Sequence, residues 1–200
     1  MSPDNELPES TDTVIVGAGV VGCSVAYHLA ELSDEDVTVV DMGAIDAPGG
    51  STVHAPGGLV ETSSSKVMSQ FAKYSRELYS DLNAYRSEGL LEIATTAERL
   101  QQAKRLYDYS QSWDIPGGEL LTPEETREHV PLLNEEEILG SYYSPTSGLI
   151  RSVELLAAMR EAARRRGAVF YGNTTVTDIA LTGSTVTAVE TDRGRIETDR

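Results

Sequence analysis

The sequence has little lysine, a single cysteine and no long apolar segment. Lys66, Lys73 and Lys104 are the only lysines, and the 32 acidic residues against 16 basic ones give a formal net charge of −16. Nucleic acids and anionic membranes would repel such a chain, so the sequence predicts neither as a partner. The acidic bias is typical of salt-adapted prokaryotic proteins, and an ordinary acidic protein is the alternative.

The low content of cysteine, histidine and apolar segments predicts no internal disulfide, no targeting signal and no metal site. Cys23 has no partner within the chain. The N-terminus is polar and acidic, whereas a signal peptide needs a basic start and an apolar run. No segment approaches the roughly 18 apolar residues of a membrane span. His28, His54 and His129 are scattered, which does not predict a metal site. These features predict a cytoplasmic protein without a bound metal.

Residues 13–41 have the order of a dinucleotide-binding βαβ unit. The β-branched run at 13–16 leads directly into a glycine-rich turn, formed by Gly17, Ala18, Gly19, Val20, Val21 and Gly22. Gly17 permits the tight turn, Gly19 lets the backbone approach a pyrophosphate, and Gly22 lets the following helix lie close to the strand. The helix N-terminus then offers N–H groups to phosphates.

Asp41 ends the second strand of this unit, predicted over residues 37–40. A carboxylate about 20 residues after the glycine turn is placed to accept hydrogen bonds from ribose hydroxyls. Between the two strands, Val25, Leu29 and Leu32 are expected to form the buried stripe of the helix. The unit therefore predicts a nucleotide site. A glycine turn in some other α/β protein is the alternative, and it leaves Asp41 unexplained.

The middle of the chain predicts a long loop followed by helices. Residues 42–58 are too rich in glycine and proline for regular structure. From Lys66 a helix is expected with one buried face, made of Val67, Phe71, Tyr74, Leu78, Leu82 and Tyr85. Capping boxes at 95–98 and 122–125 predict two further helices, with a strand over 90–94 before the first. Another helix is expected from Ser152 to the arginines at 164–166.

In the last 33 residues the hydrophobic pattern changes to a period of two, which is typical of strands. Residues 168–171, 176–181, 186–191 and 195–198 are strand candidates separated by glycine turns, and we expect an antiparallel meander. A plain NAD-binding domain would continue with further βαβ units after Asp41. The predicted fold is therefore α/β, a Rossmann-like FAD-binding fold with inserted helices and an antiparallel meander, and it is incomplete. Residues 1–11 are expected to be a flexible leader, and residues 12–200 the N-terminal part of the domain.

With these features together, the chain resembles the FAD-dependent amine and amino-acid oxidoreductases, in particular the dimethylglycine and sarcosine dehydrogenase branch. The more specific match is Gly50-Ser51-Thr52-Val53-His54-Ala55, because in that branch the loop carries the histidine that binds FAD covalently. A loop histidine that only hydrogen-bonds backbone is the alternative. Beyond the glycine turn and Asp41, the resemblance implies FAD contacts at Met42, Ser51, Thr52, His54 and Val176.

The resemblance also implies a reaction, which is oxidation of the C–N bond of an N-methylated glycine by hydride transfer to FAD. The partners would be a small amine substrate and an electron acceptor, which could be an electron-transfer flavoprotein, a quinone or oxygen. The catalytic groups are not identified, because most of the substrate domain would follow residue 200. The isolated 200 residues are therefore expected to be inactive.

Three other functions remain open. The first is a flavoprotein acting on another amine or amino acid, such as glycine or proline. The second is a non-catalytic relative that keeps the FAD fold as a regulatory module, as the regulatory subunit of pyruvate dehydrogenase phosphatase does. The third is an NAD(P)-dependent dehydrogenase, which Asp41 would permit for NAD.

Overall fold

A computed structural model describes residues 6–46 and 49–200 of the chain. The chain divides into two compact units, of which the first contains Met1–Ala55 and Ser152–Arg200 and the second contains Pro56–Arg151. Residues 1–5 of the expected leader and residues 47–48 of the expected loop lie outside the described residues. The α/β character predicted from the sequence is confirmed.

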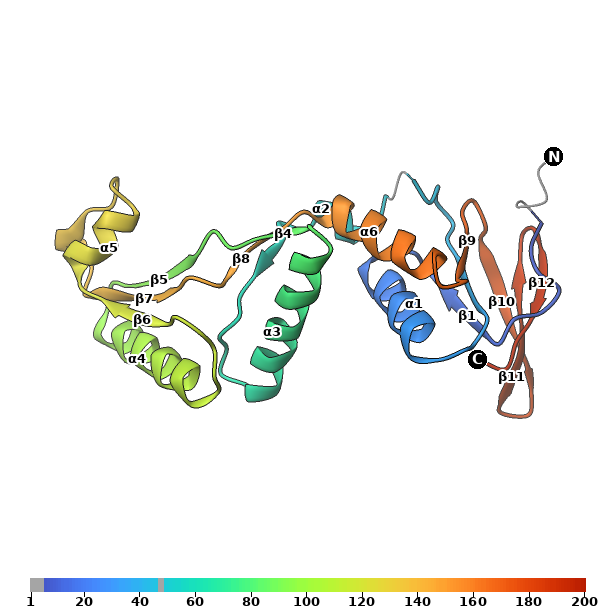
Figure 1. Cartoon of the computed structure of the whole chain (residues 1–200), viewed down its shortest axis with the longest axis horizontal. Coiled ribbons are helices and arrows are strands. Elements are labelled where there is room, and N and C mark those ends of the chain that lie inside the picture. Colours follow the sequence, from blue (N-terminus) through green and yellow to red (C-terminus); the bar gives the residue numbers. More distant parts are fainter. Residues whose placement is uncertain (1–5, 47–48) are drawn as a thin grey trace. The chain divides into compact units, whose positions relative to one another are not determined.

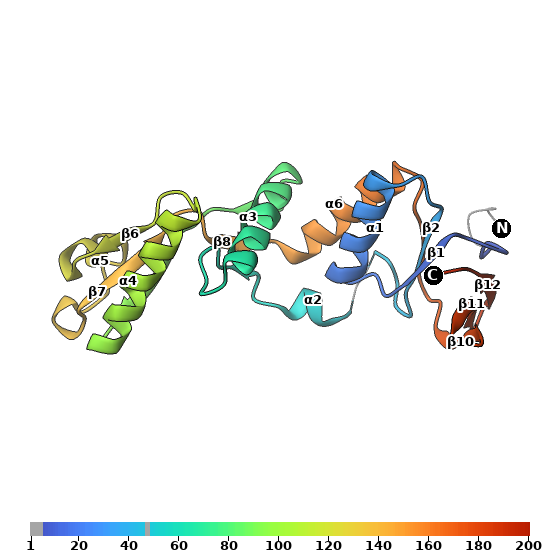
Figure 2. The ribbon, with the colours of Figure 1, turned by 90° about the horizontal axis from the view of Figure 1, so that it is seen from below.

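A three-stranded parallel sheet lies at the centre of the first unit. Its strand order is β1 (Thr13–Val16), β2 (Val37–Val40) and β9 (Val169–Tyr171). Thr13 pairs with Val37, and Thr38 pairs with Val169. All four residues of β2 are buried, as expected of the central strand of a parallel sheet covered on both faces. Figures 1 and 2 both place this sheet between a helix pair and a β-meander.

The helix pair consists of α1 (Val20–Leu32) and α6 (Ser152–Arg164), which pack side by side (Figure 1). The buried positions of α1 are Gly22, Cys23, Ala26 and Tyr27. The expected stripe was wrong, because Val25 is 42% and Leu32 is 80% exposed. Three of the four buried residues, Gly22, Cys23 and Ala26, are small, which allows close packing of α1.

The meander contains β10 (Val176–Thr182), β11 (Thr185–Thr191) and β12 (Gly194–Glu197), all antiparallel. The first of the four predicted tail strands was assigned wrongly to this meander, because β9 follows α6 as a crossover and pairs parallel with β2. Part of the expected leader lies along β12, where Thr11 N donates to Glu197 O at 3.0 Å and Glu197 N donates to Glu9 O at 2.9 Å.

The second unit has two three-stranded sheets. In one, β8 (Gly148–Ile150) lies between β3 (Gly58–Leu59) and β4 (Tyr85–Arg86). In the other, β7 (Gly140–Ser144) lies between β5 (Leu90–Ala94) and β6 (Glu119–Leu121), and all of these pairings are antiparallel. Helix α4 (Ala97–Ser112) covers the second sheet with a core of Ala103, Leu106 and Tyr142.

A threonine at the N-cap explains where each of two helices of this unit begins. Thr122 accepts a hydrogen bond from Glu125 N, and the Glu125 carboxylate accepts one from Thr122 N, so the capping box at the start of α5 (Pro123–His129) is confirmed. At α4 the N-cap is Thr96, one residue after the first residue of the predicted box at 95–98, and its hydroxyl accepts from Arg99 N. A short 3₁₀ helix, η2 (Glu135–Glu137), follows α5.

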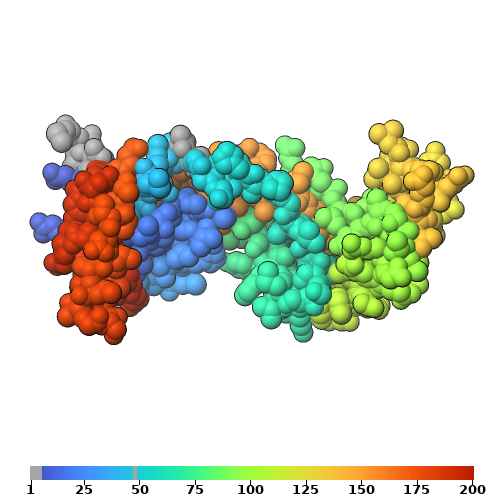
Figure 3. Space-filling view, turned by 180° about the vertical axis from the view of Figure 1, so that it is seen from behind, coloured from blue at the N-terminus to red at the C-terminus, as the bar shows by residue number. Residues whose placement is uncertain are grey.

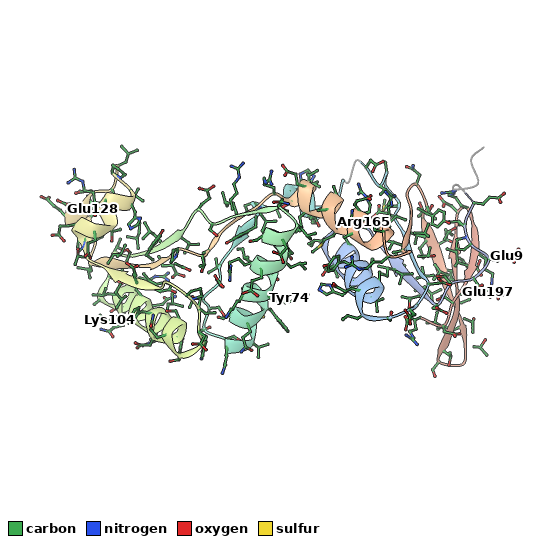
Figure 4. The ribbon with its side chains drawn as sticks, in the orientation of Figure 1. Glu9, Tyr74, Lys104, Glu128, Arg165 and Glu197 are labelled. Carbon is green, nitrogen blue, oxygen red and sulfur yellow. The ribbon has the colours of Figure 1, made fainter. Side chains whose placement is uncertain are left out.

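The face expected to be buried on α3 (Lys66–Asp81) is largely exposed within its unit. Val67 is 56%, Phe71 is 61% and Tyr74 is 49% exposed, and Ser69 is the buried residue of the helix. Tyr74 is labelled on α3 in Figure 4. Leu78 is half-buried, and the remaining two positions lie beyond the helix end, since Leu82 is its C-cap and Tyr85 belongs to β4. The helix predicted from residue 66 is present, but α3 contacts mainly β4 in this unit and has little to pack against.

Candidate nucleotide-binding site

The glycine turn connects β1 to α1 in the first unit. Gly17 has a φ of +99°, a conformation that a side chain disfavours, and its N–H donates to Val40 O at 2.7 Å. The turn therefore leaves β1 and stays attached to the end of β2. Gly19 is the N-cap of α1, has extended backbone and makes no side-chain cap, and α1 has no acidic residue in its first turn.

Two glycines of the turn have different tasks. A Cβ on Gly22 would lie 1.8 Å from Gly17 O, so only glycine fits there. A Cβ on Gly19 would meet only Thr52 Oγ1, at 3.3 Å. Gly22 is thus required for the turn to pack on the helix, whereas Gly19 keeps the space in front of the helix N-terminus open.

Asp41 follows β2 and holds two backbone segments together. Its Oδ2 accepts a hydrogen bond from Ala18 N at 2.6 Å, and its Oδ1 accepts one from Gly43 N at 2.7 Å. Two carboxylate oxygens offer about four acceptor positions. The side chain can therefore fix the glycine turn and the next loop and still accept hydrogen bonds from a ligand.

A short helix, α2 (Ser51–His54), lies in the stretch that was expected to have no regular structure. Thr52 is its second residue, and Thr52 Oγ1 accepts a hydrogen bond from Val20 N at 3.1 Å. Thr52 thus supplies from a distant segment the cap that Gly19 lacks. The glycine and proline content of residues 42–58 predicts no helix, but the four residues Ser51–His54 include no glycine or proline.

These elements enclose a cavity of about 330 Å³, at the lower end of small-molecule sites. Its walls come from the glycine turn, the segment after β2, the α2 segment and one residue of α6; they are Ala18, Gly19, Asp41, Met42, Gly43, Ala44, Ile45, Gly49, Gly50, Thr52, Val53 and Leu156. Asp41 is the only charged residue among these described positions. The positive end of the α1 dipole at Val20 is therefore the feature that favours an anion here.

The arrangement fits the ADP part of a dinucleotide. The space that a Cβ on Gly19 would fill lies at the helix N-terminus, where phosphates bind, and Asp41 lies at the carboxyl end of the neighbouring parallel strand. Among residues 6–46 and 49–200, no group of three or more His, Cys, Asp or Glu is placed to hold a metal ion. The same residues contain no helix long and apolar enough to cross a membrane.

The other expected contact residues lie outside the cavity lining. Val21 is on α1 and is 74% exposed. Ser51 and His54 are exposed on α2, which lies at the surface of its unit (cyan in Figure 3). Val176 begins β10 and is half-buried. Gly22 is buried and affects the site only by allowing the turn to pack on α1.

Sequence reasoning missed the anchoring of the segment after Asp41. The Asn173 N–H donates to Gly43 O at 2.9 Å, and Arg160 of α6 donates to Ile45 O at 2.6 Å. Arg160 lies more than 100 residues after Ile45, and a single arginine in an amphipathic helix carries no signal of such a contact.

Comparison with known proteins gives one consistent result. The family model described as FAD dependent oxidoreductase matches residues 12–200. The chain is 33% identical over 198 residues to the mitochondrial pyruvate dehydrogenase phosphatase regulatory subunit of Mus musculus, covering 96% of this chain and 22% of that protein. It is 30% identical over 209 residues to the mitochondrial sarcosine dehydrogenase of Mus musculus, covering 98% of this chain and 22% of that protein.

Among solved structures, the L-proline dehydrogenase from P. horikoshii matches with a TM-score of 0.89 and 28% identity, over 96% of this chain and 52% of that one. The chain therefore spans less than a quarter of the length of these curated relatives and about half of this solved structure.

Proposed function

Because the chain belongs to the FAD dependent oxidoreductase family, we propose that its first unit binds the ADP part of FAD and that the longer protein oxidises a small amine. The cavity carries this proposal. The N-terminus of α1, which has glycine at its N-cap position, opens into it, and Asp41 lies across from that terminus at the end of β2. These two features suit a pyrophosphate and a ribose respectively.

Each residue of the site has a task in this proposal. Gly17 and Gly22 hold the turn, Gly19 leaves room for the pyrophosphate, and Asp41 accepts from the ribose. Backbone or apolar surface beside the nucleotide comes from Ala18, Val20, Val21 and Met42. The remainder of the cofactor would contact Ser51, Thr52 and Val176. When bound, FAD supplies the chemistry by accepting a hydride from carbon next to an amine nitrogen.

We also propose a covalent bond between His54 and the flavin. His54 is exposed on α2, two residues after Thr52, which lines the cavity. Its imidazole is thus accessible to a cofactor that extends from the cavity toward α2. Acid precipitation of the FAD-loaded longer protein tests the bond, because covalently held flavin stays yellow in the pellet. Flavin found only in the supernatant would contradict it, and His54→Ala should release the colour.

The proposed substrate is an N-methylated glycine such as sarcosine or dimethylglycine. The similarity to sarcosine dehydrogenase supports this class, and the electron acceptor stays open between an electron-transfer flavoprotein, a quinone and oxygen. The 200-residue chain alone is expected not to turn over substrate. Steady formaldehyde production from sarcosine by the isolated chain would refute that expectation, and the longer protein serves as the positive control.

Cofactor binding can be tested on the isolated chain. We expect the flavin fluorescence of FAD to change on binding, ADP to compete with FAD, and FMN, which lacks the ADP part, not to compete. Gly58→Ala is a control variant, because Gly58 does not line the cavity and a Cβ there meets nothing within 4 Å. Failure of both FAD and ADP to bind would overturn the proposal. NAD⁺ binding as tight as FAD binding would instead favour a nicotinamide-dependent dehydrogenase.

A regulatory module is the second candidate, and the 33% identity to the phosphatase regulatory subunit favours it. Such a module would bind FAD without oxidising amines. Anaerobic addition of sarcosine to the FAD-loaded longer protein separates the two candidates. Bleaching of the flavin absorbance supports the enzyme, whereas unchanged absorbance with a panel of small amines supports the module. The cytoplasmic location stays a prediction.

A further inference from the structure

The segment after Asp41 forms one wall of the cavity and is held at both ends. Near its start, the Asp41 carboxylate accepts from Gly43 N at 2.7 Å, and Gly43 O accepts from Asn173 N at 2.9 Å. Met42, Gly43, Ala44 and Ile45 all line the cavity. The start of this wall is therefore fixed by the same acid that is expected to bind ribose.

The far end of the wall is held by a side chain from α6. Arg160 Nη1 donates to Ile45 O at 2.6 Å, and Arg160 Nη2 lies 3.0 Å from Asp46 Oδ1. The Arg160 side chain is only 12% exposed, whereas that of Asp46 is 88% exposed. The largely buried guanidinium is thus the fixed partner, and the loop is the part that it restrains.

The two branches of the Arg160 contact differ in strength. The bond to Ile45 O restrains the backbone directly and is largely shielded from water, whereas the ion pair with Asp46 is open to solvent on the carboxylate side. Solvent-exposed pairs contribute little, and charged hydrogen bonds that are shielded contribute more. The backbone contact should therefore carry most of the effect.

We propose that Arg160 is a positioning residue for FAD, which keeps the Met42–Asp46 segment in the conformation that the ADP part binds. This inference rests on the proposed function. Arg160 is not among the residues that line the cavity, so it acts through the segment that it holds. Without it, the segment would have to be ordered again each time the nucleotide binds, and affinity would fall.

The test measures the FAD dissociation constant of the isolated chain by fluorescence titration. Arg160→Ala should weaken binding about tenfold, the size expected for losing one shielded charged hydrogen bond. Asp46→Ala should weaken it only about twofold, and Arg160→Lys should restore part of the loss. Arg165→Ala is the matched control, because Arg165 directly follows the last residue of α6 (Figure 4), is 62% exposed and forms its ion pair with Glu161 rather than with the cavity wall.

A second measurement separates positioning from general stability. In the ligand-free chain, amide hydrogen exchange of residues 43–46 should be faster in Arg160→Ala, while exchange within β2 should be unchanged. Equal FAD affinity in wild type and Arg160→Ala would overturn the inference, as would faster exchange throughout the unit. If Arg160→Ala does not fold, Arg160→Met, which keeps the apolar stem, replaces it in both measurements. Absence of FAD binding to the wild type would instead refute the proposed function.

Discussion

Glu61 and Arg76 form an ion pair in the second unit in which the acid is completely buried. Glu61 Oε1 lies 3.1 Å from Arg76 Nε, and the exposed fractions of the two side chains are 0% and 19%. Glu61 N also donates to Ser147 Oγ at 3.0 Å. Arg76 is on α3, whose apolar face is exposed within this unit, so the pair is a main attachment of that helix.

Arg76→Ala should destabilise the second unit by about 3–5 kcal/mol, because it leaves a buried carboxylate without its partner. Urea unfolding of the isolated chain measures the change. The matched control is Arg127→Ala, since Arg127 and Glu135 form a pair at 3.3 Å with both side chains exposed; its loss should cost less than about 1 kcal/mol. Equal effects of the two substitutions would contradict this account of Glu61.

Tyr85 should make stability depend on alkaline pH. Burial, and then the charge of Glu61, raises the pKa of Tyr85 from 10.0 to about 12. Between these values the unfolded chain loses the phenolic proton and the folded chain keeps it, so stability falls as pH rises. The contribution is complete below pH 10 and is lost through about pH 12.

The measurement is the unfolding free energy of wild type and Tyr85→Phe from pH 8 to 12. At neutral pH the variant should lose about 1 kcal/mol, because Tyr85 donates a hydrogen bond to Thr146 O at 2.6 Å. Above pH 10 the difference should shrink. Tyr74→Phe, at a 49% exposed position, is the control for other tyrosines. A difference that stays constant with pH would show that Tyr85 is not the group responsible.

Gly22→Ala and Gly19→Ala should separate folding from ligand binding. At Gly22 the new Cβ would meet Gly17 O at 1.8 Å, which backbone movement must relieve, so we expect a loss of more than about 3 kcal/mol of stability. At Gly19 the Cβ would enter the cavity beside Thr52, so stability should change little while FAD affinity falls. Thermal unfolding and FAD titration of both variants check this, and the opposite pattern would refute the assignment.

Local signals in the sequence were sufficient for some elements. Strand β5 begins and ends at the predicted residues, and the Thr122–Glu125 capping box forms as predicted, because adjacent residues decide both. The glycine turn and Asp41 come together at one edge of the sheet for the same reason: the order strand, turn, helix, strand fixes which ends are neighbours.

The other features of the fold depend on tertiary contacts between distant residues, which local sequence patterns do not predict. Val25 and Phe71 fit the period of a buried helix face, but which face is covered depends on distant elements. Arg160 and Ile45 meet across α6 and the loop after β2, and no local pattern connects them. The parallel pairing of β9 with β2 is likewise a consequence of the crossover through α6.

Thr52 should contribute to both the stability of the ligand-free chain and its affinity for FAD. Its hydroxyl oxygen accepts from Val20 N at 3.1 Å, and a hydroxyl can donate a second hydrogen bond at the same time. Because Thr52 lines the cavity, that donor is available to a phosphate at the N-terminus of α1. Thr52→Val removes both bonds while keeping the shape of the side chain.

We therefore expect Thr52→Val to lower the unfolding free energy of the ligand-free chain by about 1 kcal/mol, the usual value of a helix N-cap. FAD affinity should fall about tenfold, because a hydrogen bond to a charged phosphate is lost. Urea unfolding and FAD titration measure the two effects, and Thr52→Ser should retain both bonds. If Thr52→Val binds FAD more tightly than wild type, Thr52 competes with the phosphate for Val20 N, and its assignment as a cofactor contact is wrong.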